Sequence, residues 1–119
     1  KTYYLATLDG TVPDVRPFGT IDLFDGKLYI QTGKRKKVYR QMKANPKVSI
    51  CAMLGKQWIR IAATVEEDDN IKAQEHMLDV YPELKGMYKA GDGNNVVFFL
   101  KEVTAAICSF DTDPKIFKF

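Results

Sequence analysis

VRPFGTIDLFDGKLYIQTGKRKKVYRQMKANP, residues 15–46, predicts two strands and a helix in close succession. Residues 15–24 and 27–32 are rich in apolar and β-branched side chains, and the Asp-Gly pair between them favours a two-residue hairpin turn. Residues 36–44 carry apolar side chains four positions apart, which is typical of a helix, and the Asn-Pro pair that follows would end it. The stretch therefore predicts a hairpin that leads directly into a short helix.

The register of this hairpin brings polar groups together at its open end. A turn at the Asp-Gly pair places Phe24 opposite Lys27, and the same register places Gly19 opposite Thr32. Arg16 then comes level with the residues just after the second strand, where the predicted helix begins. Because the first N–H groups of a helix have no helical partner, this end of the hairpin is suited to bind a phosphate.

The positive charge of the chain is concentrated in this region. Residues 32–43 contain six Lys and Arg and no acid, and residues 34–47 contain seven of the 18 in the chain. The other segments carry eleven positive against fifteen negative charges. Lys36 and Lys37 fall in the first helical turn, which is unfavourable unless an anion neutralises them. One local basic site for a small anion fits this pattern better than a surface for nucleic acid, since only Tyr39 is interleaved with the basic residues.

The remaining chain predicts mostly short strands joined by hairpins. Expected strands cover 3–8, 47–54, 57–66, 96–100 and 103–110, the last two as separate strands or one bent strand, and a second helix covers 70–80. This order favours an antiparallel barrel or sandwich with helices at its ends, in a single domain over 1–119. Because VVFFL at 96–100 is apolar on both faces, we expect cover on both sides, and a homodimer would provide it.

Several kinds of chemistry are disfavoured by composition. The one histidine, His76, gives no zinc site and no Ser-His-Asp triad, and we expect it to be exposed on its helix. Cys51 and Cys108 lack metal-site spacing and are expected to be buried free thiols in a reducing cytoplasm. No membrane span or signal peptide is recognisable, although the chain starts at Lys1 without Met, so preceding sequence is expected to be missing. Any redox chemistry would need a borrowed cofactor.

The segments VRPFGTIDLFDGKLYIQTGKRKKVYRQMKANPKVSICAM (15–53) and WIRIAATVEED (58–68) together resemble a known family. They are similar to the FMN-binding split-barrel proteins of the pyridoxamine 5′-phosphate oxidase-like superfamily. The small bacterial general stress proteins and 5-nitroimidazole reductases of the Nim type are the most similar branch. The resemblance implies a mainly β fold with helices, a six-stranded antiparallel split β-barrel, and a homodimer with FMN at the subunit interface.

The resemblance also implies which residues bind the cofactor. They are Arg16, Pro17, Phe18, Gly19, Gln31, Thr32, Lys36, Lys37 and Trp58. The two lysines would hold the phosphate, and Trp58 would reach across from the second subunit. Position 21 is Ile where true pyridoxamine-phosphate oxidases carry a lysine nearby, and the chain ends in FDTDPKIFKF without their C-terminal Trp and Arg segment. Vitamin B6 oxidation is therefore not expected.

Three functions remain open from the sequence. The leading one is an FMN-dependent oxidoreductase, a small nitroreductase-like enzyme that passes electrons from an unidentified donor to an unidentified small molecule, with no catalytic side chain assigned. The alternative is a flavin- or haem-binding carrier or sensor without robust turnover, since relatives on this barrel bind haem or a deazaflavin. The third is an anion- or nucleic-acid-interaction protein that uses residues 34–47.

Overall fold

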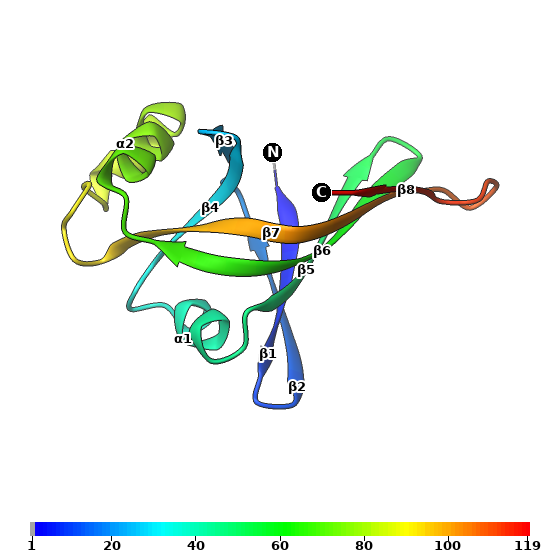
Figure 1. Ribbon diagram of the computed structural model, residues 1–119, viewed down its shortest axis with the longest axis horizontal. Helices are drawn as coiled ribbons and strands as arrows, with labels where there is room; N and C mark the ends of the chain where they lie inside the picture. Colours follow the sequence, from blue (N-terminus) through cyan, green and yellow to red (C-terminus); the bar gives the residue numbers. More distant parts are fainter. Residues whose placement is uncertain (1) are drawn as a thin grey trace.

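The computed structural model describes residues 2–119, which form one curved antiparallel β-sheet with two α-helices and a 3₁₀-helix at its ends (Figure 1). The strands are β1 (Tyr3–Asp9), β2 (Val12–Phe18), β3 (Asp22–Phe24), β4 (Lys27–Gly33), β5 (Lys47–Leu54), β6 (Gln57–Asp68), β7 (Asn95–Cys108) and β8 (Lys115–Lys118). The helices are α1 (Lys37–Ala44), α2 (Ile71–Val80) and the 3₁₀-helix η1 (Pro82–Gly86).

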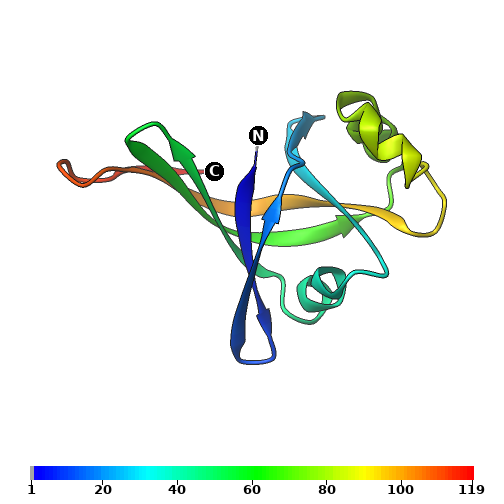
Figure 2. The ribbon, with the colours of Figure 1, turned by 180° about the vertical axis from the view of Figure 1, so that it is seen from behind.

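The order of the strands makes the sheet an open, or split, barrel. The hydrogen-bonded order is β2-β1-β5-β6-β7-β4-β3, and β8 adds to β7. Figure 2 shows the long strands β6 and β7 spanning the molecule, with the β1–β2 hairpin crossing them on one side. The edge strands β2 and β3 are joined by residues 19–21 rather than by a ladder of hydrogen bonds. The expected mainly β split-barrel fold is therefore confirmed, with eight hydrogen-bonded strands where six were expected.

The predicted first strand of the hairpin, residues 15–24, is wrong as a single strand. Its second half is β3, which pairs with β4 in the predicted register, from Phe24 opposite Lys27 to Asp22 opposite Tyr29. Its first half belongs to β2, which pairs with β1 instead. β2 contains two prolines, which donate no backbone hydrogen bond and are tolerated because β2 is an edge strand.

A side chain continues the predicted register where the backbone ladder stops. Thr20 Oγ1 accepts the backbone N–H of Gln31 at 3.1 Å and lies 3.4 Å from the Gln31 carbonyl, to which it donates. Tyr3 Oη donates to the Thr20 carbonyl at 2.6 Å and ties this connection to β1. The facing of Gly19 and Thr32 thus follows from the sequence, although the hydrogen bonds that produce it are not those of a hairpin.

The core lies inside the curve of the sheet. α1 contributes Val38 and Met42, the pair predicted four positions apart, and both are buried against Leu5 and Ile30. Asn70 caps α2 by accepting the backbone N–H of Lys72 at 3.0 Å. The burial of Val38 and Met42 fixes α1 at one end of the barrel, next to the end of β4.

Residues 96–100 and 103–110, predicted as either two strands or one bent strand, form the single bent strand β7, which ends at Cys108. Glu102 has a φ of 52°, and the register with β6 shifts by one residue there, which is typical of a β-bulge. Both faces of its apolar segment are covered within the chain: Phe98 packs in the main core, and Val97 packs against Tyr29 and Met77. Residues 96–100 therefore need no second subunit to cover them, contrary to expectation.

Candidate functional site

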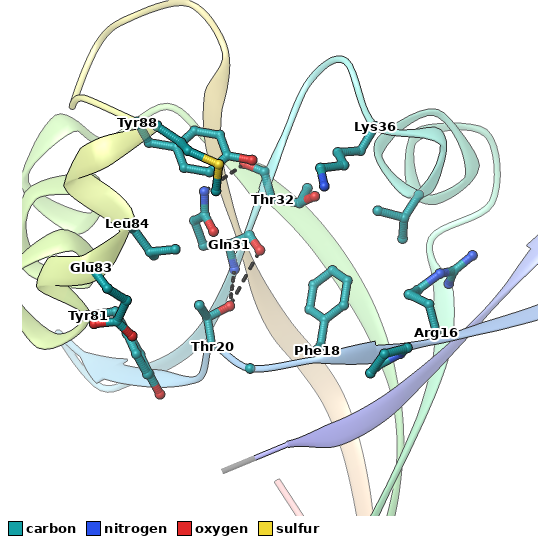
Figure 3. Close-up of a pocket in the computed structure, with 14 residues that line it drawn as sticks. Arg16, Phe18, Thr20, Gln31, Thr32, Lys36, Tyr81, Glu83, Leu84 and Tyr88 are labelled. Atoms are coloured by element: carbon teal, nitrogen blue, oxygen red, sulfur yellow. Dashed lines mark hydrogen bonds between the residues drawn. The ribbon is translucent and has the colours of Figure 1, made fainter.

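A pocket of about 340 Å³ opens between the β2–β3 connection, the end of β4, the start of α1 and η1 (Figure 3). β2 and the turn after it contribute Arg16, Pro17, Phe18, Gly19 and Thr20; β4 contributes Gln31 and Thr32; α1 contributes Lys36 and Val38; and the α2–η1 segment contributes Tyr81, Glu83, Leu84, Met87 and Tyr88. The pocket includes all the residues that the sequence assigned to the cofactor except Lys37 and Trp58. The predicted meeting of Arg16, Thr32 and the α1 N-terminus is confirmed.

Lys36 provides a free positive charge in this pocket. It is the N-cap residue of α1, and its amine points toward the Thr32 side chain in Figure 3. The amine has no acidic partner within residues 2–119. The helix that follows has no side-chain cap and no acid in its first turn. Its N-terminus is therefore open to an anionic ligand.

Arg16 lines the same pocket but is held by the protein. Its guanidinium donates to Thr7 Oγ1 at 2.8 Å and to Gln41 Oε1 at 2.7 Å, and it lies 3.1 Å from the Asp14 carboxylate. The hydrogen bond from Gln41 and the charge of Arg16 hold the pKa of Asp14 below its usual range. Arg16 therefore contributes a rigid, largely compensated charge, in contrast to Lys36.

The two remaining predicted residues lie elsewhere in this chain. Lys37 Nζ is 3.4 Å from Asp9 and 3.8 Å from Asp14, and it lines a separate depression beside the β1–β2 turn. Trp58 lies near the start of β6, where its ring is 4.9 Å from that of Phe110. A role of either in binding a cofactor stays a prediction, and for Trp58 that role involves a second subunit.

The wall formed by η1 was not predicted from the sequence. Tyr81 Oη donates to the Ile21 carbonyl at 2.9 Å and accepts the Ile21 N–H at 3.1 Å, so it fastens η1 to the β2–β3 connection. Tyr88, buried, lies so close to Gly33 that a Cβ on the glycine would be 2.9 Å from Tyr88 Oη. Pro82 at the end of α2 was the only sequence signal for this segment, and it does not indicate which strand the segment covers.

Much of the basic stretch is neutralised by acids from other elements. Lys43 and Lys34 lie 3.0 and 3.7 Å from the Glu67 carboxylate, which also accepts a hydrogen bond from Tyr39 at 2.9 Å. Burial raises the pKa of Glu67, but the hydrogen bonds from Lys43 and Tyr39 and the two lysine charges outweigh burial and lower it. This pairing reduces the charge available for a nucleic-acid backbone.

The other residues considered for chemistry lie outside the pocket. His76, expected to be exposed, is partly buried: its Nδ1 is 2.6 Å from the buried Asp22 carboxylate, and its ring lies 4.9 Å from that of Phe24 in a tilted arrangement. Both cysteines are free, but Cys51 is exposed, contrary to expectation, while Cys108 is buried. Residues 2–119 contain no cluster of three or more side chains suited to bind a metal. Across the same part of the chain, no helix is both long and apolar enough to cross a membrane.

Comparison with known proteins gives a consistent picture. The family model described as pyridoxamine 5′-phosphate oxidase matches residues 1–102. A NimC/NimA family protein from Clostridium acetobutylicum is 41% identical with a TM-score of 0.93, and the match covers 99% of this chain and 83% of that one. No curated protein matches the chain.

Two more distant structures share the fold. A pyridoxamine 5′-phosphate oxidase-related, FMN binding protein from Nostoc punctiforme has 13% identity and a TM-score of 0.65 over 99% of this chain and 87% of that one. A heme binding protein from Mycobacterium smegmatis has 17% identity and a TM-score of 0.76 over 98% of this chain and 52% of that one. From the family model and the 41% identical structure together, the chain belongs to the pyridoxamine 5′-phosphate oxidase family.

Proposed function

We propose that this chain binds FMN in the pocket beside α1 and acts as a flavin-dependent reductase on a small molecule. The observation that carries the proposal is the free Lys36 amine beside the uncapped α1 N-terminus, in the pocket that contains most of the expected flavin contacts. The family supports flavin as the cofactor class. The Nostoc punctiforme protein, which shares the fold, is named as an FMN binding protein.

The polar end of the pocket fits a phosphate group. Lys36 and the first N–H groups of α1 supply donors, and Arg16 adds positive charge from the neighbouring wall. Charge-assisted hydrogen bonds contribute about 1.5–3 kcal/mol each. Two or three of them would supply much of the roughly 8 kcal/mol of a micromolar complex.

The apolar part of the lining fits a flat, mostly apolar ring. Phe18, Leu84 and Met87 provide this part, and the pocket volume of about 340 Å³ is in the range of small-molecule sites. A Cβ placed on Gly19 would meet nothing within 4 Å, so the backbone opposite Thr32 is open to close approach. When bound there, FMN would supply the redox chemistry that the side chains of this chain lack.

A homodimer is part of the proposal. It rests on exposed apolar side chains of the sheet and not on the apolar segment of β7. The register places exposed apolar side chains on one outward face of the sheet, across β2, β1, β5 and β8. Val15, Tyr4, Met53 and Ile116 on this face are 62%, 54%, 60% and 55% exposed. Several large exposed apolar side chains on one face of the sheet favour an interface between subunits. Trp58 lies on the same face and is the side chain we expect to reach the partner's pocket.

The 41% identity to a NimC/NimA family protein favours reductase activity over simple storage of the cofactor. The departure from pyridoxamine-phosphate oxidases at Ile21 argues against a vitamin B6 substrate. We expect the protein to work in the cytoplasm with a reduced nicotinamide as donor. The acceptor would bind at the η1 side of the pocket, where Glu83 and Tyr81 supply the polar groups.

Haem is the second candidate because a protein of this fold from Mycobacterium smegmatis is named as heme binding. An axial ligand would have to come from Met87, Tyr81 or Tyr88, because His76 pairs with Asp22 outside the pocket lining. The lysine and helix terminus are better matched to a phosphate. FMN is thus the better-supported ligand.

The visible spectrum of purified protein titrated with FMN tests the proposal. Binding of one FMN per chain, followed by bleaching on addition of NADH or NADPH, supports a flavin reductase. Bound FMN that neither nicotinamide reduces supports a carrier or sensor instead. A Soret band with no affinity for FMN refutes the flavin proposal.

A further inference from the structure

A chain of buried amides connects the pocket wall to the loop before β7. Gln31 Nε2 donates to Asn95 Oδ1 at 2.9 Å and to the Thr32 carbonyl at 3.1 Å. Asn95 Nδ2 in turn donates to Gln74 Oε1 at 3.4 Å, and the same oxygen accepts the backbone N–H of Gly91 at 2.9 Å. Gln31, Gln74 and Asn95 are 6%, 6% and 2% exposed, and of the three only Gln31 lines the pocket.

Backbone groups at the two ends fix the direction of every hydrogen bond in this chain. The Gly91 N–H can only donate, so Gln74 must turn its oxygen toward it. Asn95 must then present its nitrogen to Gln74 and its oxygen to Gln31. The Thr32 carbonyl can only accept, so it also requires the nitrogen of Gln31. Reversing the Gln31 amide would set its oxygen against two acceptors.

The far end of the chain is itself held in place. Asp92 accepts the backbone N–H of Lys89 at 2.9 Å, of Asn94 at 2.8 Å and of Asn95 at 2.6 Å. These hydrogen bonds hold the pKa of Asp92 below its usual range, so the carboxylate remains a charged acceptor at neutral pH. Gly91, with a φ of +73°, takes the left-handed conformation that this turn requires. The loop of residues 91–95 (GDGNN) thus holds the far end of the amide chain in place.

One oxygen remains without a donor. Gln31 Oε1 accepts no hydrogen bond within residues 2–119. Every side-chain oxygen or nitrogen in that range that solvent cannot reach does have a hydrogen-bond partner. The oxygen is therefore accessible, and because Gln31 lies on the pocket wall between Thr20 and Tyr88, the accessible side is the pocket (Figure 3). We propose that Gln31, oriented by Asn95 and Gln74, presents a fixed hydrogen-bond acceptor that binds an N–H group of the ligand.

The identity of that N–H group rests on the proposed function. The oxidised flavin ring carries a single N–H, at N3; its acceptors are N1, N5 and the two carbonyl oxygens, and N10 carries the ribityl chain. A fixed acceptor therefore favours the N3–H edge at Gln31 and disfavours the other polar edges there. Asn95 and Gln74 are positioning residues in this scheme: they determine the orientation of the bound ring without touching it.

The fixed acceptor can be tested in ¹⁵N-labelled protein without any ligand. We expect the Gln31 side-chain amide protons to exchange with solvent at least about tenfold more slowly than those of exposed glutamines. In Asn95→Ala this protection should fall, although Asn95 lies outside the pocket. Gln74→Glu is the matched variant, because it keeps both acceptor contacts, and the protection of Gln31 should persist. Unprotected Gln31 protons in the unmodified protein would overturn the inference.

The assignment to N3–H is tested with ¹⁵N-labelled FMN. Gln31→Met keeps the length of the side chain and removes the acceptor, so we expect a Kd for FMN about three- to tenfold higher and faster exchange of the N3 proton. Asn95→Ala should also speed N3 proton exchange, and Gln74→Glu should not. An N3 proton that exchanges equally in bound Gln31→Met and in the unmodified complex would overturn the assignment. If FMN does not bind the unmodified protein, the proposed function and the N3 assignment are both refuted, whereas the ligand-free exchange measurement still decides the fixed acceptor.

Discussion

Replacing Lys36 by Ala removes the one positive charge of the pocket that no acid within residues 2–119 pairs with. The Lys36 amine has no acidic partner within residues 2–119, and its side chain lines the pocket at the uncapped end of α1. Lys37, its neighbour, is 63% exposed and pairs with Asp9 and Asp14. The two substitutions change the formal charge equally, so any difference between them reports the location of the ligand phosphate.

The expected magnitude follows from the kind of bond that is lost. A charge-assisted hydrogen bond to phosphate contributes about 1.5–3 kcal/mol, which corresponds to a roughly tenfold to hundredfold rise in the Kd for FMN. Lys37→Ala removes only long-range attraction at an exposed position, screened over about 10 Å at 0.1 M salt, so we expect a change of about threefold or less. Free energies of unfolding without ligand should change little for Lys36→Ala, since no ion pair is broken.

The assay is the quenching of FMN fluorescence, titrated at two salt concentrations, with riboflavin as a ligand that lacks the phosphate. Lys36→Ala should weaken FMN strongly and riboflavin hardly at all. Lys72→Ala, an exposed lysine of α2 that does not line the pocket, is the control for loss of charge. Equal weakening by Lys36→Ala and Lys37→Ala would refute the geometric reasoning. Loss of riboflavin binding in Lys36→Ala would show that the substitution disturbs the pocket itself.

Three further predictions concern stability and pocket shape. Glu67→Gln should lower the free energy of unfolding by about 1 kcal/mol at neutral pH, because Glu67 is 17% exposed and pairs with Lys43. Since the folded-state pKa of Glu67 is lowered from 4.5, its contribution is present above that pH and lost as pH falls below it, so urea titrations of the variant should show a weaker acid dependence. Gly33→Ala should displace Tyr88 and cost about 1–3 kcal/mol together with weaker FMN binding; unchanged stability would contradict the 2.9 Å approach. Met77→Ala, at a position with 0% exposure between α2 and the sheet, should cost about 2–5 kcal/mol by thermal unfolding while the barrel core persists.

The parts of the fold that sequence predicted well depend on local signals. The turn at the Asp-Gly pair is set by the positive φ of Asp25 and Gly26, 52° and 75°, and it fixed the register of β3 and β4 correctly. The core side of α1 followed from the spacing of Val38 and Met42. Such signals act over a few residues, so one sequence is enough to detect them.

The errors in the predicted strands arose where a strand pairs with a segment that is distant in the sequence. Nothing in the sequence separates residues 15–18 from β3, and only their pairing with β1, from Phe18 opposite Tyr3 to Val15 opposite Ala6, shows that they belong to another strand. β8 was missed because residues 115–118 are exposed and carry no burial pattern; their strand exists because β7 offers an edge. The η1 wall was missed for the same reason, since its place depends on contacts of Tyr81 and Tyr88 with other elements.

The sequence located the end of the hairpin where the pocket lies, but local composition could not show the charge that a ligand meets there. The sequence favoured one local anion site in the basic stretch but did not show which of its lysines are free to serve that site. Glu67 neutralises Lys34 and Lys43, and the acids of β1 and β2 neutralise Lys37. These acids are remote in sequence, so a count of local charge overstates what a ligand meets. Lys36 differs from those neighbours because the first turn of α1 aims it at the end of β4 instead of at an acidic strand. The specificity of this pocket for a single phosphate would then come from the ion pairs that neutralise the surrounding lysines. Glu67→Gln removes the acid that pairs with two of these lysines, so it should strengthen nonspecific binding of polyanions more than binding of FMN.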